Sequence, residues 1–169
     1  ARDLFAPLGE RMKVGIVWGG SPSHRNDSNR SIAFLEFLEL LRVPNVALIS
    51  LQKGERAADL EASGCGALVS NLDAAIADFA DTAALVAELD LVIMCDSSVA
   101  HLAGALGAPV WVLVPFTPDW RWLIGRDDSP WYPSMRLFRQ SEPQRWDDVM
   151  RNVVRALHTT AASHSTGSE

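Results

Sequence analysis

Short apolar runs that alternate with helical patterns restrict the fold of this chain more than any other feature. Five runs are almost continuously apolar and a sixth follows a long loop, at residues 14–18, 46–51, 66–70, 91–95, 110–114 and 135–138. Strands that are apolar on both faces are typical of parallel sheets covered by helices on each side. We therefore predict an α/β fold, a doubly wound, Rossmann-like parallel sheet of five to six strands flanked by helices.

The segments between these runs predict the helices. We expect helices at residues 31–41, 82–89, 98–106 and 146–157. A further helix should follow residues 52–53 and end near residue 64. The helix at 146–157 has one apolar stripe, formed by Trp146, Val149, Met150, Val153, Val154 and Leu157. We place one domain at residues 13–158, a linker or fragment start at 1–12, and a disordered tail at 159–169, where small polar residues dominate.

The charge balance bears on the partners. The chain has 21 acidic and 15 basic residues, a formal net charge of −6, and a chain of this sign is a poor polyanion binder. We predict no nucleic-acid partner. All basic residues except Lys13 and Lys53 are arginines, whose planar forks suit phosphate or carboxylate, although genomic base composition gives the same skew.

Cysteine usage and hydropathy indicate a cytoplasmic, non-membrane chain. Cys65 and Cys95 border apolar runs without the spacing of metal ligands, which favours buried thiols in a reducing compartment. The stretch 92–116 holds only one charged residue, Asp96, and is long enough to span a bilayer. Glycines, a proline and a polar cluster interrupt it, so strand, turn, helix and strand fit better.

Two common nucleotide-binding motifs are missing. The first predicted strand is followed by Gly19, Gly20 and Ser21 instead of the glycine pattern of dinucleotide enzymes, and Gln52 and Lys53 stand where a ribose-binding acid is expected. The sequence has no phosphate-binding loop of the Walker type either. The first departure argues against a dinucleotide oxidoreductase, and the second excludes the P-loop kinases and ATPases.

The segment 96–101 is the strongest candidate for a binding site. It follows the fourth predicted strand, where ligands of such sheets bind, and opens a helix whose first amides can hold phosphate. Asp96 and Ser97 can cap this helix, and its positive end should keep His101 neutral. A capped helix with a buried, satisfied histidine fits the residues equally well. A hydrolase triad of Asp96, Ser98 and His101 is a poor alternative, because all three lie within about one turn and a nucleophile elbow is missing.

Two further segments border the same edge of the sheet. In the loop 19–30, Arg25 or Arg30 can neutralise a diphosphate, although a solvated polar loop is the simpler interpretation. Segments 115–122 and 129–133 gather three tryptophans and the only tyrosine, which can line a base or sugar pocket but more simply pack the sheet edge. The histidines and carboxylates are too scattered for a metal site, so we predict none.

Several motifs together resemble a known family. They are VGIVWGG at 14–20 with NDSNRSI at 26–32, SLQKG at 50–54, DFADTAAL at 78–85 and DSSVAHLA at 96–103. From about 13 to 157 the chain is similar to the carboxyl-terminal, donor-binding half of GT-B glycosyltransferases of the heptosyltransferase type, glycosyltransferase family 9. It looks closest to the form found in bacterial tetratricopeptide-repeat glycosyltransferase proteins.

The resemblance implies a site for a nucleoside-diphosphate sugar without a metal or other cofactor. The donor diphosphate would lie at residues 96–101, and residues 79–82 would border the base and ribose. Arg30, at a position where heptosyltransferases tend to have lysine, would stabilise the phosphates of the leaving group. The substrate-binding candidates are Gly19, Gly20, Arg25, Asn26, Arg30, Gln52, Lys53, Phe79, Asp81, Thr82, Asp96, Ser97, Ser98 and His101.

The resemblance also implies that something is missing. Such enzymes carry their catalytic base in an amino-terminal acceptor half, so we expect no catalytic base here and no sugar transfer by this chain alone. A non-catalytic interaction module that kept the fold and a GT-B sugar-nucleotide epimerase domain remain alternatives. The partners implied are a nucleotide sugar and the missing half or repeat region, with self-association through an exposed face possible. The residues do not identify the base, the sugar or the glycan or protein acceptor.

Overall fold

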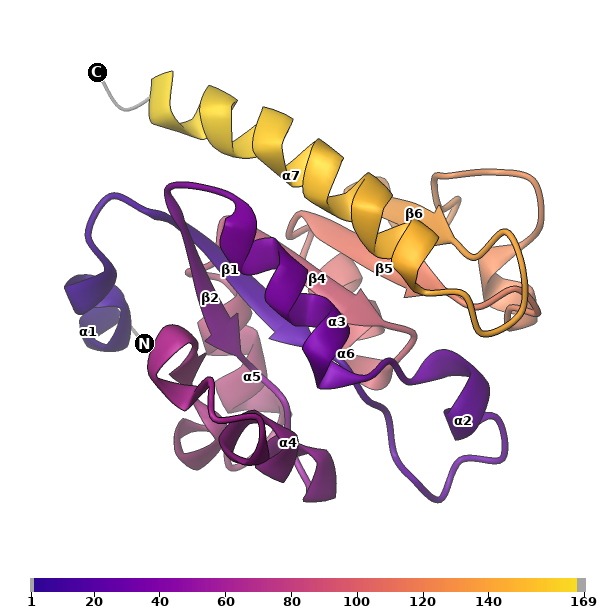
Figure 1. Cartoon of the computed structure of the whole chain (residues 1–169), viewed down its shortest axis with the longest axis horizontal. Helices are drawn as coiled ribbons and strands as arrows, with labels where there is room; N and C mark the ends of the chain where they lie inside the picture. The colour runs from indigo at the N-terminus through magenta and orange to yellow at the C-terminus, as the bar shows by residue number, and fades with distance from the viewer. Residues whose placement is uncertain (1, 167–169) are drawn as a thin grey trace.

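The computed structural model describes residues 2–166 and contains one six-stranded parallel sheet (Figure 1). The strands lie in the order β3-β2-β1-β4-β5-β6. Their bounds are β1 Met12–Val17, β2 Val46–Ser50, β3 Ser70–Asn71, β4 Leu91–Cys95, β5 Val110–Val114 and β6 Met135–Arg139. This is the strand order of a doubly wound fold, and the prediction from the apolar runs is confirmed.

The central strands show why the apolar runs predict the sheet so well. Every residue of β4 and β5 is buried, because helices cover both faces of the sheet. The third predicted strand is the exception. Residues 66–68 form a 3-10 turn, and only Ser70 and Asn71 pair with β2 at the sheet edge. A strand at the sheet edge has one neighbouring strand, and Leu68 is 60% exposed there. A longer strand at this edge would therefore gain little from burial of its side chains.

The helices form two layers (Figure 1). On one face, α3 (Phe34–Phe37), α4 (Ala58–Ala62) and α7 (Asp147–Thr166) share a buried core with alternate residues of β1, β2 and β4. On the other face, α5 (Phe79–Val86) and α6 (Ser98–Ala105) build a second core with the remaining sheet residues. All six residues of the predicted α7 stripe pack in the first core, with Val154 only partly buried.

Three segments differ from their predicted secondary structure. The helix expected at 31–41 is a short α3 followed by a 3-10 helix, Leu38–Arg42, and the preceding loop contains one helical turn, α2 (Asp27–Arg30). The segment before α4 is the 3-10 turn Glu55–Ala57. The helix expected at 82–89 begins at Phe79, because the carboxylate of Asp78 accepts hydrogen bonds from the amides of Ala80 and Asp81.

Residues 2–8 and 159–166 are more ordered than their composition predicts. Helix α7 continues through residues 159–166, and Ala161 is buried in the core, so the disordered tail predicted there is wrong for these residues. Residues 167–169 of that prediction lie outside the described chain. Near the start, α1 (Arg2–Phe5) and the 3-10 turn Ala6–Leu8 place Phe5 in the second core. A single buried aromatic side chain therefore fixes a segment expected to be a linker.

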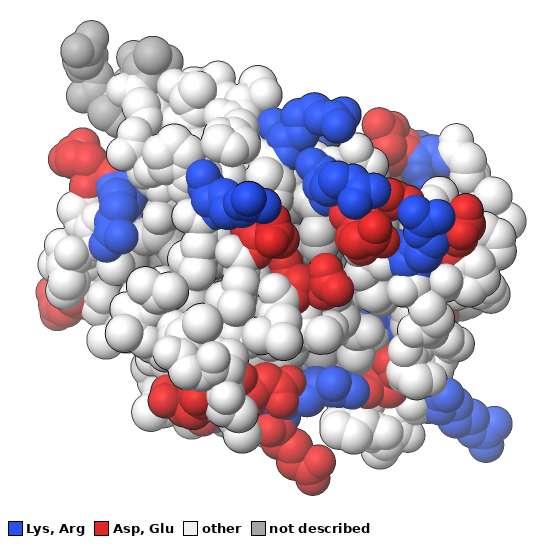
Figure 2. All heavy atoms as spheres, in the orientation of Figure 1, with Lys and Arg blue, Asp and Glu red and all other residues white. Residues whose placement is uncertain are grey.

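Surface charges are intermixed on the face that Figure 2 shows. Arg145 and Arg151 both pair with Asp147 and Asp148 at the start of α7. These two basic side chains therefore have acidic neighbours, and the expectation of no nucleic-acid partner stays a prediction. Within residues 2–166, no helix is long and apolar enough to cross a membrane.

The two cysteines are free thiols. Cys95, the last residue of β4, is completely buried, and this burial raises the pKa of its thiol to about 12. Cys65 is only partly buried. The predicted burial is therefore confirmed for Cys95 and only in part for Cys65.

Candidate functional site: a two-lobed cleft at the centre of the sheet

The sheet order fixes where the cleft lies. Strands β1 and β4 are neighbours, and the chain continues from them toward opposite edges of the sheet. The connections that leave these strands diverge, which opens a crevice beyond their carboxyl ends. Two adjoining cavities of about 790 and 780 Å³ occupy this region. His24, Arg30, Ser97 and Ser98 line both cavities, so we treat the cavities as two lobes of one cleft.

The lobes differ in their walls. The first, the aromatic lobe, is bordered by His101, Trp120, Trp131 and Tyr132 together with polar residues such as Asp96 and Asp119. The second, the apolar lobe, is bordered by Val17, Leu51, Ile76, Phe79 and Val99 together with the glycines that follow β1.

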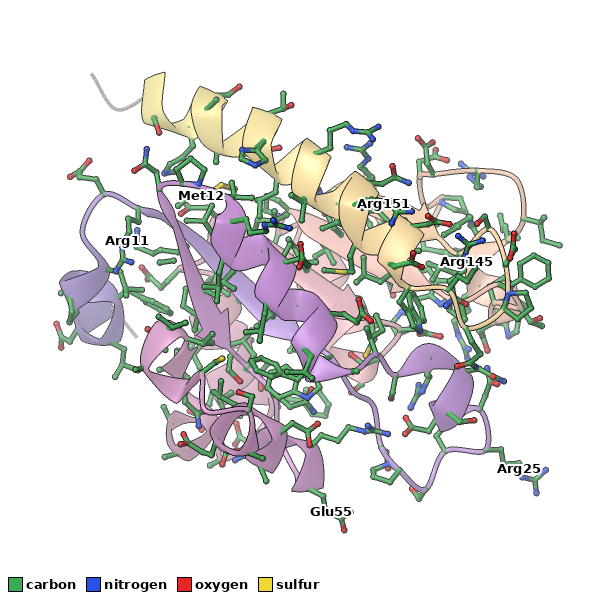
Figure 3. The ribbon with its side chains drawn as sticks, in the orientation of Figure 1. Arg11, Met12, Arg25, Glu55, Arg145 and Arg151 are labelled. Atoms are coloured by element: carbon green, nitrogen blue, oxygen red, sulfur yellow. The ribbon has the colours of Figure 1, made fainter. Side chains whose placement is uncertain are left out.

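Most of the predicted site residues line this cleft. Those in the aromatic lobe are Asn26, Arg30, Asp96, Ser97, Ser98 and His101, and those in the apolar lobe are Gly19, Gly20, Arg30, Gln52, Lys53, Phe79, Thr82, Ser97 and Ser98. Arg25 and Asp81 line neither lobe. The Arg25 side chain extends away from the molecule (Figure 3), and the Asp81 carboxylate accepts a hydrogen bond from the Ala77 amide at 2.9 Å.

Helix α6 points its amino end at the junction of the lobes. Ser97 occupies the N-cap position, but its side chain makes no capping hydrogen bond, and its hydroxyl lies 4.0 Å from the Met94 sulfur. The predicted side-chain cap by Ser97 is therefore absent. Helix α5, in contrast, is capped by Asp78. An α6 terminus without this cap keeps amide donors and the positive end of the helix dipole available to an anion.

A buried carboxylate organises the loop after β1. Asp27 is 6% exposed, and its Oδ2 accepts a hydrogen bond from Arg56 at 2.6 Å, while Arg30 Nε lies 3.5 Å from its Oδ1. Ser31 donates to Oδ1 at 2.8 Å and accepts a hydrogen bond from the Gly20 amide at 3.1 Å. Burial by itself raises the pKa of Asp27, but the hydrogen bonds from Arg56 and Ser31 and the two positive charges outweigh it, so the pKa is lowered.

Arg30 and Arg56 lie against the glycines of the same loop. A Cβ atom on Gly20 would collide with the Arg30 guanidinium, and one on Gly19 would collide with the Arg56 side chain. The Nε atoms of both arginines are buried and have no hydrogen-bond partner within residues 2–166. The two glycines thus allow two cations to approach the floor of the cleft.

Gln52 has a structural role in this arrangement. Its Oε1 accepts hydrogen bonds from the amides of Trp18 and Gly19 at 3.0 and 2.9 Å, and its Nε2 donates to the carbonyls of Gly19 and Lys53 at 3.0 Å. The side chain is only 3% exposed, so it holds the ends of β1 and β2 together. Lys53 is half-exposed and pairs with Asp73 at 2.8 Å.

His101 is held between aromatic side chains. Its ring stacks on Trp122 at a centroid distance of 5.1 Å, and its Nδ1 lies 3.1 Å from the Tyr132 hydroxyl. Burial is the main cause that lowers the pKa of His101; Arg121 adds to this effect and Asp96 opposes it. The expected neutral ring agrees with this direction, although burial, rather than the helix dipole, is the leading cause.

The lowered pKa of His101 gives a test by pH. In the unfolded chain His101 takes up a proton near the ordinary histidine pKa of about 6.5, and in the folded chain it does so only at lower pH. As pH falls below about 6.5, the folded state should therefore lose free energy of unfolding. We expect His101→Gln to reduce this loss between pH 7 and 5, measured by urea unfolding at each pH. Equal slopes for the two proteins would contradict a lowered pKa.

The wall of the aromatic lobe is built by the segment after β5. The 3-10 turn Trp120–Trp122 begins at Asp119, whose carboxylate accepts from the Arg121 amide and guanidinium at 3.0 and 2.8 Å. Arg139 of β6 donates to the carbonyls of Trp122, Leu123 and Arg126, and so fixes the turn against the sheet. Trp122 is buried beneath, whereas Trp120 and Trp131 are 66% and 55% exposed.

Sequence reasoning missed the lining residue Arg56 and left the role of three aromatic lining residues open between a pocket wall and packing. Arg56 carries no motif of its own, and only the predicted position of its segment at the carboxyl edge of β2 could have indicated it. For Trp120, Trp131 and Tyr132, packing was the favoured interpretation, but the structure places all three on the cleft wall. Among the described residues, no group of three or more histidine, cysteine or acidic side chains could hold a metal ion.

The comparison of sequences gives one curated relative. Protein FlbA of Caulobacter vibrioides is 32% identical over 160 residues, which cover 92% of this chain and 26% of FlbA. This chain thus spans about a quarter of that relative's length. No protein-family model matches the sequence.

Solved structures confirm the predicted fold. ADP-heptose LPS heptosyltransferase II of E. coli superposes with a TM-score of 0.69 at 17% identity over 97% of this chain and 51% of its own. Heptosyltransferase WaaC of E. coli with ADP gives 0.60 at 14% identity over 92% and 45%, and a family 9 glycosyl transferase of Veillonella parvula gives 0.59 at 10% over 96% and 48%. The chain therefore has the fold of about half of a heptosyltransferase-like glycosyltransferase.

Proposed function

We propose that this chain is the donor-binding part of a glycosyltransferase, and that its cleft holds a nucleoside-diphosphate sugar. One observation carries the proposal: Arg30, Ser97 and Ser98 line both lobes at the amino end of α6, where the Ser97 side chain provides no cap. A nucleoside-diphosphate sugar has the negative charges of its two phosphates in the middle, the nucleoside at one end and the sugar at the other. A cleft with its anion-binding elements in the middle and a lobe on each side matches this layout.

The names of the structural neighbours support the same ligand class. One is an ADP-heptose heptosyltransferase and another was solved with ADP. We extend this to the present chain as an inference, with Phe79 and Thr82 beside the nucleoside in the apolar lobe. In the transfer reaction, Arg30 and the α6 amides would stabilise the charge that develops on the departing nucleoside diphosphate.

The chain spans about half of the three glycosyltransferases, which leads us to propose that a second half supplies the acceptor site and the catalytic base. We expect donor binding but no sugar transfer from these 169 residues alone. We also propose that binding needs no metal, because arginine guanidinium groups and helix amides provide the positive charge. An interaction module is the second candidate, favoured by the exposed side chains of Phe116, Trp120 and Ile124.

A nucleotide panel tests this function. We expect one of ADP, UDP, GDP, CDP and dTDP to raise the thermal midpoint of the 169-residue chain by roughly 5–10 °C at about 100 times its dissociation constant. The matching nucleoside without phosphates should give little shift, and EDTA should leave the shift unchanged. If all five nucleotides fail at millimolar concentration while the chain is folded, donor binding is refuted and the interaction module becomes the better candidate.

A further inference from the structure

We propose that Tyr132 is a positioning residue for His101: its hydroxyl donates to Nδ1, so the neutral imidazole carries its proton on Nε2, the nitrogen that is left to the cleft. The tautomer is a property of the chain alone. Its use in holding an anionic ligand rests on the proposed function.

Tyr132 lies close to His101 because a glycine leaves room for it. Gly104 follows His101 by three residues in α6, so both lie on the same face of the helix. A Cβ atom on Gly104 would lie 2.6 Å from the Tyr132 ring. The Met135 amide donates to the Tyr132 carbonyl at 3.0 Å, which ties the tyrosine to the start of β6. Helix and sheet together therefore set the 3.1 Å separation between the hydroxyl and Nδ1.

The imidazole ring is confined by two aromatic neighbours. It stacks on Trp122 at an interplanar angle of 13°, and the Tyr132 ring lies 5.8 Å from it at 56°. Trp122 is only 1% exposed, so it is a fixed surface. A half-turn of the imidazole about its Cβ–Cγ bond would place a carbon where Nδ1 lies and lose the hydrogen bond. The confined ring therefore keeps Nδ1 toward the tyrosine.

The direction of this hydrogen bond follows from the acidity of the two groups. A phenol is a stronger acid than the N–H of a neutral imidazole, so the hydroxyl is the better donor and the bare ring nitrogen the better acceptor. Within residues 2–166, the Tyr132 hydroxyl makes no hydrogen bond other than that to Nδ1. Burial lowers the pKa of His101, so the ring is neutral near pH 7. Nδ1 accepts, and the proton lies on Nε2.

The free nitrogen is available to a ligand. Among the described residues, Nε2 of His101 makes no hydrogen bond, and it is not one of the buried polar atoms without a partner. His101 borders the aromatic lobe with Ser97 and Ser98, at the amino end of α6. An N–H at Nε2 adds one donor to the helix amides there, whereas the opposite tautomer would present a lone pair that repels phosphate oxygens. Tyr132 thus acts on anion binding through His101.

Nitrogen-15 NMR tests the tautomer without any ligand. The 169-residue chain is labelled at its histidines and measured at a pH of about 7.5, and the His101 signals are assigned by their loss in His101→Gln. We expect Nδ1 to resonate far downfield as an unprotonated nitrogen and Nε2 as a protonated one. Tyr132→Phe should move Nδ1 further downfield, because this nitrogen loses its donor. A protonated Nδ1 in the wild-type chain, or an unchanged Nδ1 shift in Tyr132→Phe, overturns the proposal.

A double-mutant cycle tests whether Tyr132 acts through His101. Calorimetric titration with ADP, UDP, GDP, CDP and dTDP first identifies the accepted diphosphate. We expect Tyr132→Phe to weaken its binding about three- to tenfold when His101 is present and less than twofold in the His101→Gln background. The substitution keeps the ring against Gly104, so the fold should be preserved, and the thermal midpoints of all four proteins check this.

The outcomes separate this inference from the proposed function. Equal weakening by Tyr132→Phe in both backgrounds would show that the tyrosine acts independently of His101, and no weakening in either would show that the tautomer does not serve binding. Both results overturn the positioning role and leave donor binding intact. If no diphosphate binds to the wild-type chain, the proposed function fails, and the nitrogen-15 shifts alone decide the tautomer.

Discussion

Replacement of Asp27 by alanine is expected to lower the free energy of unfolding by about 3–5 kcal/mol, because it leaves two largely buried cations without their shared counter-ion. Arg30 and Arg56 both pair with this carboxylate, and the Arg30 side chain is only 12% exposed. The same substitution removes the acceptor of the Ser31 hydroxyl, which in turn accepts from the Gly20 amide. The loop that lines the cleft should therefore loosen, and urea unfolding measures the total effect.

Two controls distinguish this network from ordinary surface pairing. Asp128→Ala breaks an exposed pair with Arg126, and the unfolding midpoint should hardly change. Asp27→Asn keeps the oxygen that accepts from Ser31 but loses the charge, so an intermediate loss is expected. A loss for Asp27→Ala no larger than that for Asp128→Ala would show that the buried carboxylate does not organise the loop.

The lowered pKa of Asp27 adds a dependence on pH. A carboxyl with a lower pKa in the folded than in the unfolded chain stabilises the fold above its unfolded pKa of about 3.8. This contribution disappears as pH falls through the folded pKa. The wild-type chain should thus lose stability more steeply on the acid side of pH 4 than Asp27→Asn does. Parallel acid limbs in denaturant titrations would argue against the ion-pair assignment.

The sequence predicted the sheet because burial on both faces leaves a simple pattern. Strands β4 and β5 were predicted with the correct bounds, since each is a run of buried apolar residues between turn signals. The edge strand β3 could not be delimited in this way, because one neighbouring strand and partial exposure impose no such pattern. The extension of α7 to Thr166 was not predicted for a related reason. Its buried residue, Ala161, is small, so the segment shows no apolar stripe in the sequence.

The candidate site was predictable to the extent that it depends on strand ends. The segments after β1 and β4 had to meet once the sheet order was known, which placed Arg30 and Ser97 together. For Arg56 the sequence indicates at most a place near the carboxyl end of β2, because the approach of its side chain depends on a buried carboxylate and on a glycine that leaves room for it. The position of Ser97 before a predicted helix suggested a side-chain cap, and only the side-chain geometry shows that its hydroxyl does not provide one.

Replacement of Arg30 by alanine is expected to weaken binding of the accepted nucleoside diphosphate by roughly 10- to 100-fold. A charge-assisted hydrogen bond contributes about 1.5–3 kcal/mol, and Arg30 lies where the two lobes join, beside the amino end of α6. Arg30→Lys should retain part of the affinity, because it keeps the charge but loses the fork. Calorimetric titration at 50 and 200 mM salt should also show a smaller salt dependence for the alanine variant.

The matched control is Arg25, five residues earlier in the same loop. Its side chain extends into solvent and lines neither lobe, so Arg25→Ala removes one positive charge from the loop without touching the cleft (Figure 3). We expect Arg25→Ala to change the affinity less than twofold. Because Arg30 also pairs with Asp27, the thermal midpoint of each variant must be measured, and binding compared well below it. Equal losses for Arg25→Ala and Arg30→Ala would mean that net charge, not the placement of Arg30 at the junction of the lobes, attracts the nucleotide.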